Sequence, residues 1–251
     1  MTYCLAANLD EGMVFVSDSR TNAGVDQIST FSKMHTFCGD GERFFVLLSA
    51  GNLATTQAVV AKLARDVRHG ENTSLASLAT MAEVADYVGA ASRSIQARHA
   101  GKDEDSGFIA EASFILGGQI RNQPQRLYLV YPEGNYVHTT DRTPYLQIGE
   151  TKYGKPILDR IVARTTDLET AARCALVSMD STMRSNATVG PPVEVLLYRR
   201  DSQAEGERLL FEEDSEYLAQ IRSAWQESLR RAFEELPPFT RATKNIRLVD
   251  G

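Results

Sequence analysis

Three residues in the first part of the chain could together carry out nucleophilic chemistry, and Thr2 is the first of them. Thr2 follows the initiator Met1, and its short side chain suits removal of Met1 by a methionine aminopeptidase. The α-amine thus freed would have a pKa of about 7.7 to 8, so it could act as general base toward the threonine's own hydroxyl. An ordinary N-terminal strand residue is the alternative interpretation of Thr2 alone.

Asp18 and Lys33 are the other two residues of this set. Asp18 follows the apolar run 13–17, where a carboxylate is costly to bury unless it is paired. Lys33 directly precedes the apolar segment 34–37. Beside a threonine hydroxyl, Lys33 would supply positive potential that lowers the hydroxyl pKa, and Asp18 would hold the ammonium in place. A structural salt bridge between two strands would explain the same pair.

The segment Ser49-Ala50-Gly51 lies where an apolar run gives way to a helical pattern. Glycine allows close approach of the backbone, and an N–H at the start of a helix can donate to an oxyanion. A plain strand-to-helix turn fits this segment equally well.

Strands and helices alternate in groups along the chain. Apolar runs separated by turn residues predict strands, and apolar residues at helical spacing predict helices. The expected strands are 3–7, 13–17, 34–37, 43–50, 111–119, 126–132, 135–139 and 193–200, and the expected helices are 52–69, 75–100, 153–164, 167–184 and 214–235. This grouping predicts the α+β class, a four-layer αββα sandwich of two antiparallel sheets flanked by helices. We expect a single domain over residues 1–251, with a C-terminal helix and tail from about residue 214.

Composition excludes several other classes of function. The 251 residues are 43% hydrophobic and 24% charged, with a net charge of −6, so a basic footprint for nucleic acid is missing. No apolar run approaches the ~20 residues that span a bilayer, and the first residues lack a basic signal-peptide segment, so we expect a cytoplasmic protein. Cys4, Cys38 and Cys174 are expected as buried thiols. The four histidines lack metal-ligand spacing, and no metal or cofactor is expected.

The order of the candidate residues carries a resemblance. Thr2, then Asp18-Ser19-Arg20, then Lys33, then Ser49-Ala50-Gly51 before a long helix resembles proteasome β-subunits and their bacterial relative HslV. The segment SDSRTNAGVDQISTFSKMHTF, residues 17–37, is more similar still to Anbu, the bacterial proteasome-related peptidase family. The resemblance to Anbu runs along the full chain.

The resemblance implies an N-terminal-nucleophile hydrolase with assigned residue roles. Thr2 matches the nucleophile and its amine the base, Asp18 and Lys33 match the supporting pair, and the N–H of Gly51 matches the oxyanion hole. Thr21 and Asn22 fall where these enzymes pair their backbone with an extended substrate. Ser49 falls near the residue that shapes the pocket for the side chain before the scissile bond.

Two regions depart from the proteasome pattern. The segment Ile148-Gly149-Glu150-Thr151 lacks the serine of a Ser-Gly pair, and the segment 184–188 lacks an Asp that precedes a Ser. In the second region Ser185 and Thr188 are the nearest counterparts, and with Arg20 they are expected as possible supporting residues. Peptidase strength and specificity are therefore left open.

The function expected on this basis is a threonine peptidase that forms an acyl-enzyme ester and hydrolyses it. Removal of Met1 would be the only processing step. The family implies a homo-oligomer, ring-like or open and helical, acting on a peptide or protein, with no unfoldase partner specified. Two alternatives remain: a non-catalytic assembly subunit, and an N-terminal-nucleophile amidase or acyl-transfer enzyme acting on a small amide. The residues do not separate hydrolysis from acyl transfer.

Overall fold

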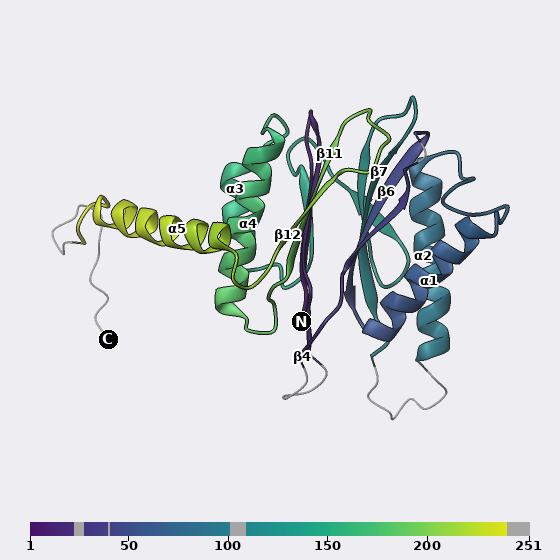
Figure 1. Cartoon of the computed structure of the whole chain (residues 1–251), viewed down its shortest axis with the longest axis horizontal. Helices are drawn as coiled ribbons and strands as arrows, with labels where there is room; N and C mark the ends of the chain where they lie inside the picture. The colour runs from purple at the N-terminus through teal and green to yellow at the C-terminus, as the bar shows by residue number, and fades with distance from the viewer. Residues whose placement is uncertain (23–27, 40, 101–108, 240–251) are drawn as a thin grey trace, which may run out of the picture.

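Two five-stranded antiparallel sheets stack face to face, and helices cover both outer faces (Figure 1). The computed structural model describes residues 1–22, 28–39, 41–100 and 109–239. The first sheet has the order β10-β1-β2-β11-β12, formed by Tyr145–Gly149, Tyr3–Asn8, Gly12–Asp18, Val193–Arg199 and Glu207–Phe211. The second has the order β5-β6-β7-β8-β9, formed by Met34–Cys38, Arg43–Gly51, Ala112–Ile120, Arg126–Val130 and Tyr136–His138.

A small two-stranded sheet and five helices complete the described elements. β3 (Arg20–Asn22) pairs with β4 (Ile28–Thr30). The helices are α1 (Leu53–Arg68), α2 (Met81–His99), α3 (Lys155–Ile161), α4 (Leu168–Ser185) and α5 (Glu216–Glu234). α1 and α2 pack on the second sheet and α3 and α4 on the first, which gives the expected αββα sandwich (Figure 1). None of the helices within the described ranges is long and apolar enough to cross a bilayer.

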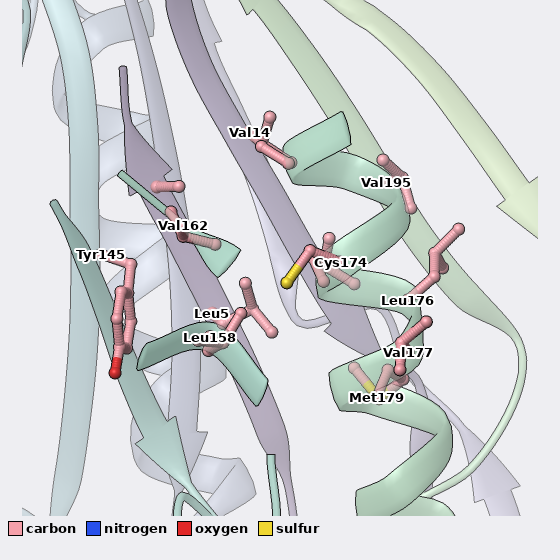
Figure 2. Close-up of a cluster of buried hydrophobic side chains, with 14 of the residues drawn as sticks. Leu5, Val14, Tyr145, Leu158, Val162, Cys174, Leu176, Val177, Met179 and Val195 are labelled. Atoms are coloured by element: carbon pink, nitrogen blue, oxygen red, sulfur yellow. The ribbon is translucent and has the colours of Figure 1, made fainter. Parts of the chain in front are cut away.

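Period-two alternation in the central strands explains why their sequences read as continuous apolar runs. In β1, Leu5 faces the layer below α3 and α4, whereas Cys4 and Ala6 face the space between the sheets. In β6, Leu47 faces α1 and α2, whereas Leu48 faces the space between the sheets. Three apolar layers result, one between the sheets and one under each helix pair. Figure 2 shows the layer where β1, β2 and β11 meet α3 and α4.

Several boundaries differ from the sequence-based expectation. The second helix begins at Met81 and not at residue 75, because Thr80 caps it in a reciprocal capping box with Glu83. Leu75 is buried in the preceding loop, which is why its spacing mimicked a helix. The sequence did not predict β3, β4, β10 or β12. Cys4 and Cys174 are buried as expected, whereas Cys38 at the end of β5 is only partly buried.

Candidate active site

Thr2 directly precedes β1, the strand that lies between β2 and β10 in the first sheet. Its carbonyl accepts a hydrogen bond from the Glu150 N–H at 2.8 Å, and Tyr3 pairs with Gly149 in the register of β1 and β10. Gly149 has a φ of +81°, and a Cβ there would come within 2.0 Å of the Thr2 carbonyl oxygen. Only glycine therefore lets the end of β10 approach Thr2 so closely. The start of the chain is fixed by main-chain contacts on this side.

Asp18 and Lys33 form a buried ion pair next to that strand. The Lys33 Nζ donates to Asp18 Oδ1 at 2.8 Å, and the Tyr3 N–H donates to the same oxygen at 2.9 Å. Lys33 Nζ also donates to the Arg20 carbonyl at 2.7 Å, and the Gly190 N–H donates to Asp18 Oδ2 at 3.3 Å. The Asp18 side chain is 0% exposed and that of Lys33 is 8% exposed. The ammonium is therefore held by the same carboxylate oxygen that binds the N–H of Tyr3, the residue after Thr2.

The charges of this site shift two pKa values in ways that matter for Thr2. Burial raises the pKa of the Asp18 carboxyl, and the adjacent Lys33 ammonium opposes that shift. Burial also lowers the pKa of the chain's amino group, here that of Met1, and the charge of Lys33 lowers it further. A lowered amine pKa leaves more of the neutral base at a given pH, which is the form that can accept a proton.

A cavity of about 460 Å³ opens in front of this pair. Five of the residues singled out from the sequence line it: Thr2, Thr21, Lys33, Ser49 and Gly51. His35, Thr56 and Gln57 contribute further polar side chains to its wall. The cavity is large enough for a side chain together with the reacting amide of a substrate.

Gly51 ends β6 two residues before the first residue of α1. Its φ is +114°, and a Cβ there would come within 2.3 Å of the Glu111 carbonyl oxygen. Asn52 then caps the helix, because its side-chain oxygen accepts from the Thr55 N–H at 3.1 Å. A glycine at position 51 therefore allows the close contact with Glu111, just before β7, and the turn from β6 into α1. The role of the Gly51 N–H as an oxyanion donor stays a prediction.

The structure does not bring all expected supporting residues to the cavity. The Arg20 guanidinium donates to the Ala187 carbonyl at 2.9 Å, so it ties β3 to the segment after α4. The Ser185 hydroxyl donates to the Ser181 carbonyl, one turn earlier in α4, and Ser185 is exposed. Asn22 ends β3, and its side chain lies outside the described residues.

Thr188 connects to the site through two residues that the sequence reasoning did not assign. The Thr188 hydroxyl donates to Asn186 Oδ1 at 2.6 Å, and Asn186 Nδ2 donates to Glu150 Oε2 at 3.0 Å. Glu150 is 7% exposed, and its charge acts on the chain's amino group. The sequence signal for Glu150 is a carboxylate directly after Gly149, in a segment whose only expected feature was the lack of a serine.

The fold and the site define a class of protein. A four-layer αββα sandwich, with a threonine at the start of a central strand and a buried lysine beside it, is the architecture of proteasome-type N-terminal-nucleophile proteins. A comparison with models of protein families found no match, and neither did a comparison with curated proteins.

Solved structures give a more specific answer. Anbu, the ancestral β-subunit, from Yersinia bercovieri is 46% identical with a TM-score of 0.90, over 96% of this chain and 100% of that one. A structure described as the helical assembly of the Anbu complex from Pseudomonas aeruginosa is 45% identical with a TM-score of 0.91, over 97% and 100%. A Gly-1 mutant of Anbu from Hyphomicrobium sp. strain MC1 is 43% identical with a TM-score of 0.88, over 96% and 100%. The chain belongs to the Anbu family of proteasome-related proteins.

Proposed function

We propose that this protein is a threonine-type peptidase or amidohydrolase whose nucleophile is Thr2 after Met1 has been removed. One observation carries the proposal: Thr2, Lys33 and Gly51 line the same cavity, and Lys33 is held there by Asp18. Met1 is 65% exposed and lies outside β1, so its removal takes no residue from that strand.

The proposed reaction begins when the Thr2 Oγ attacks the carbonyl carbon of an amide. The hydroxyl proton passes to the α-amine of Thr2, and the negative charge on the former carbonyl oxygen is stabilised by the Gly51 N–H. The C–N bond then breaks, the leaving amine takes the proton, and an ester on Thr2 remains. Water adds to this ester with the amine again as base, which releases the carboxylic acid and restores Thr2. Lys33, held in place by Asp18, supplies positive potential beside Thr2 throughout.

We propose that the substrate is a peptide bound in an extended form along Thr21. This residue lies in β3 and lines the cavity beside Thr2, and its hydroxyl oxygen is buried without a hydrogen-bond partner among the described residues. Main-chain pairing with a short strand is a common way to hold an extended peptide. Ser49, which lines the same cavity, would contact the side chain that precedes the scissile bond.

We also propose that the protein works as a homo-oligomer, either ring-like or open and helical. The related Pseudomonas aeruginosa protein is described as a helical assembly. In this chain α5 projects away from α4, and it exposes Leu229 and Phe233 (Figure 1). Apolar side chains of this size on a projecting helix are typical of a surface that another chain covers.

The test compares Thr2→Ala and Thr2→Ser with the wild type. A peptide β-lactone should form an ester with the wild type and with the serine variant. Both proteins should also cleave a fluorogenic peptide, and the alanine variant should not cleave it. We expect a loss of at least about a thousandfold for Thr2→Ala, because the nucleophile is removed. Turnover by Thr2→Ala at the wild-type rate would contradict the proposal. A wild type that assembles but never reacts would favour a non-catalytic assembly subunit.

A further inference from the structure

Glu194 and Arg208 form a second ion pair. It contacts the residue after Asp18 and the residues on both sides of Lys33. Glu194 lies in β11 and Arg208 in the neighbouring strand β12, at the edge of the first sheet. Their side chains form a salt bridge in which the Glu194 side chain is 6% exposed and that of Arg208 is 38% exposed. Burying a carboxylate this completely is costly unless it is paired, and Arg208 and Ser19 are the partners of Glu194.

Glu194 contacts the residue that follows Asp18. Its Oε1 accepts a hydrogen bond from the Ser19 hydroxyl at 3.2 Å, and Glu194 lies opposite Ser17 in the register of β2 and β11. The carboxylate therefore touches the chain directly beside Asp18, although it makes no contact with Asp18 itself in the described hydrogen bonds.

Arg208 contacts the residues on both sides of Lys33. Its Nη2 donates to the Ser32 hydroxyl at 3.3 Å and to the Met34 carbonyl at 3.2 Å. Ser32 and Lys33 lie before the first residue of β5. The Lys33 carbonyl accepts from the Ser49 N–H at 3.0 Å. One guanidinium from the first sheet thus contacts the residues on both sides of Lys33, in addition to the ion pair that Lys33 forms with Asp18.

We propose that Arg208, held by Glu194, is a positioning residue that sets the place of the Lys33 ammonium relative to the amino group of Thr2. The inference rests on the proposed function. The two side chains bridge the sheets by contacting the neighbours of Asp18 and of Lys33, so they fix the two strand ends from which the catalytic ion pair projects. Without this bridge, Ser32 and Met34 lose their contacts with Arg208. Among the described residues, the Asp18–Lys33 ion pair is then the remaining polar side-chain contact between residues 32–34 and the first sheet, and Lys33 moves relative to Thr2.

The position of Lys33 has a direct readout, because its charge lowers the pKa of the chain's amino group. Asp18 and Glu150 face the same amino group and act in the opposite direction. Displacing Lys33 therefore raises the pKa of the amine. Competitive labelling with acetic anhydride across a pH series, read by mass spectrometry of the N-terminal peptide, measures this pKa and does not require Thr2 to act as a nucleophile.

The experiment uses the full-length chain with Arg208→Ala, Arg208→Lys and Glu194→Gln. Arg199→Ala is the matched control, because Arg199 pairs with Glu169 at the surface of β11 and both side chains are about 70% exposed. Each protein is tested by amine labelling and by the rate of β-lactone esterification of Thr2, separated into the maximal rate and the half-saturating concentration. Melting temperatures show which variants are folded.

We expect Arg208→Ala to raise the amine pKa and to lower the maximal esterification rate about tenfold, with the half-saturating concentration unchanged. Arg208→Lys should recover part of both effects, Glu194→Gln should show both more weakly, and Arg199→Ala should match the wild type. A folded Arg208→Ala protein with the wild-type amine pKa and esterification rate would overturn the inference. If Arg208→Ala does not fold, the same comparison is decided by Arg208→Lys and Glu194→Gln. A shifted amine pKa in a protein that never reacts with the lactone would uphold the positioning role and reject the peptidase function.

Discussion

The Lys33 side chain is buried among polar partners, and the proposed chemistry depends on its charge. Its ammonium meets the Asp18 carboxylate and the Arg20 carbonyl, while Asp18 receives two further main-chain hydrogen bonds from Tyr3 and Gly190. A buried ion pair satisfied in this way is far more costly to break than to replace as a whole. Stability and reactivity can therefore be separated by substitution.

Lys33→Met should lower the melting temperature markedly, because it leaves the Asp18 carboxylate buried without a cation, at a cost of about 3–5 kcal/mol. Asp18→Asn combined with Lys33→Met should recover most of that stability. Thr2 esterification should stay lost in both proteins, since neither has the lysine charge. Thermal melts and lactone kinetics measure the two properties, and wild-type reactivity in the double variant would contradict the role given to Lys33.

The pH dependence of Thr2 reactivity should follow the α-amine. The amine is a base only when neutral, so the rate is full above its pKa and is lost as pH falls through it. Burial and Lys33 lower this pKa from its usual value of 8.0 for the Met1 amine. Thr2 is bonded to Tyr3, whose N–H donates to the same Asp18 oxygen that binds Lys33. We therefore expect the esterification rate to be half-maximal below pH 8.0. A half-maximal point above that pH would show that the charges of the site act in the opposite sense.

At the scale of elements, the ends of β10 and β1 must meet almost in contact. Gly149→Ala should displace the N-terminal strand, because a Cβ would come within 2.0 Å of the Thr2 carbonyl oxygen at a φ of +81°. Gly70→Ala is the control: its φ is +64°, but a Cβ there meets nothing within 4 Å. Both variants should lose about 1–2 kcal/mol to the left-handed backbone. Only Gly149→Ala should also lose Thr2 esterification, and equal reactivity of the two would argue against the close contact.

The elements also show why part of the fold could be predicted from the sequence. The strands at 3–7, 13–17 and 43–50 were recognisable because both of their faces are buried, which requires continuous apolar residues. β12 was missed because its sequence, ERLLF, places two charged residues before three apolar ones and therefore shows no alternation, and residues 207 to 210 are exposed. β10 was missed because it is short and its burial is uneven.

The candidate site divides in the same way. Thr2, Asp18 and Lys33 could be proposed from the sequence because their types and order carry the chemistry. Glu150 and Asn186 could not be connected to Thr2, because their contact depends on the pairing of β10 with β1 and on where α4 ends. The Glu194–Arg208 bridge depends likewise on the stacking of the two sheets, which residue spacing does not encode.

At the scale of the whole molecule, α5 is the part that the sandwich leaves most exposed (Figure 1). Leu218 and Ile221 anchor its first turns on α4, whereas Leu229 is 50% and Phe233 is 75% exposed. A hollow of about 290 Å³ lies among α3, α4 and α5, a second of about 500 Å³ lies between α4 and α5, and Trp225 lines both of them. An apolar helix end of this kind is stabilised when another chain covers it.

Combining Leu229→Asp with Phe233→Asp should therefore reduce the mass of the particle, because both charges would be placed in the covered surface. Gln220→Asp is the control, since residue 220 is exposed and lies on the opposite side of α5 from Leu229 at 100° per residue. Light scattering coupled to size-exclusion chromatography measures the mass. An unchanged mass for the double variant would remove α5 from the assembly surface.

The central claim is that Thr2 is an accessible and activated N-terminal nucleophile. Intact and peptide mass spectrometry of the wild-type protein, with and without a threonine-reactive epoxyketone, tests it most directly. We predict that Met1 is absent from the purified protein and that one inhibitor molecule adds to each chain, on Thr2. An epoxyketone reacts with both the hydroxyl and the free α-amine of the same residue, so the adduct reports both groups of the mechanism at once. Retained Met1, or a free Thr2 that never forms the adduct, would contradict the claim.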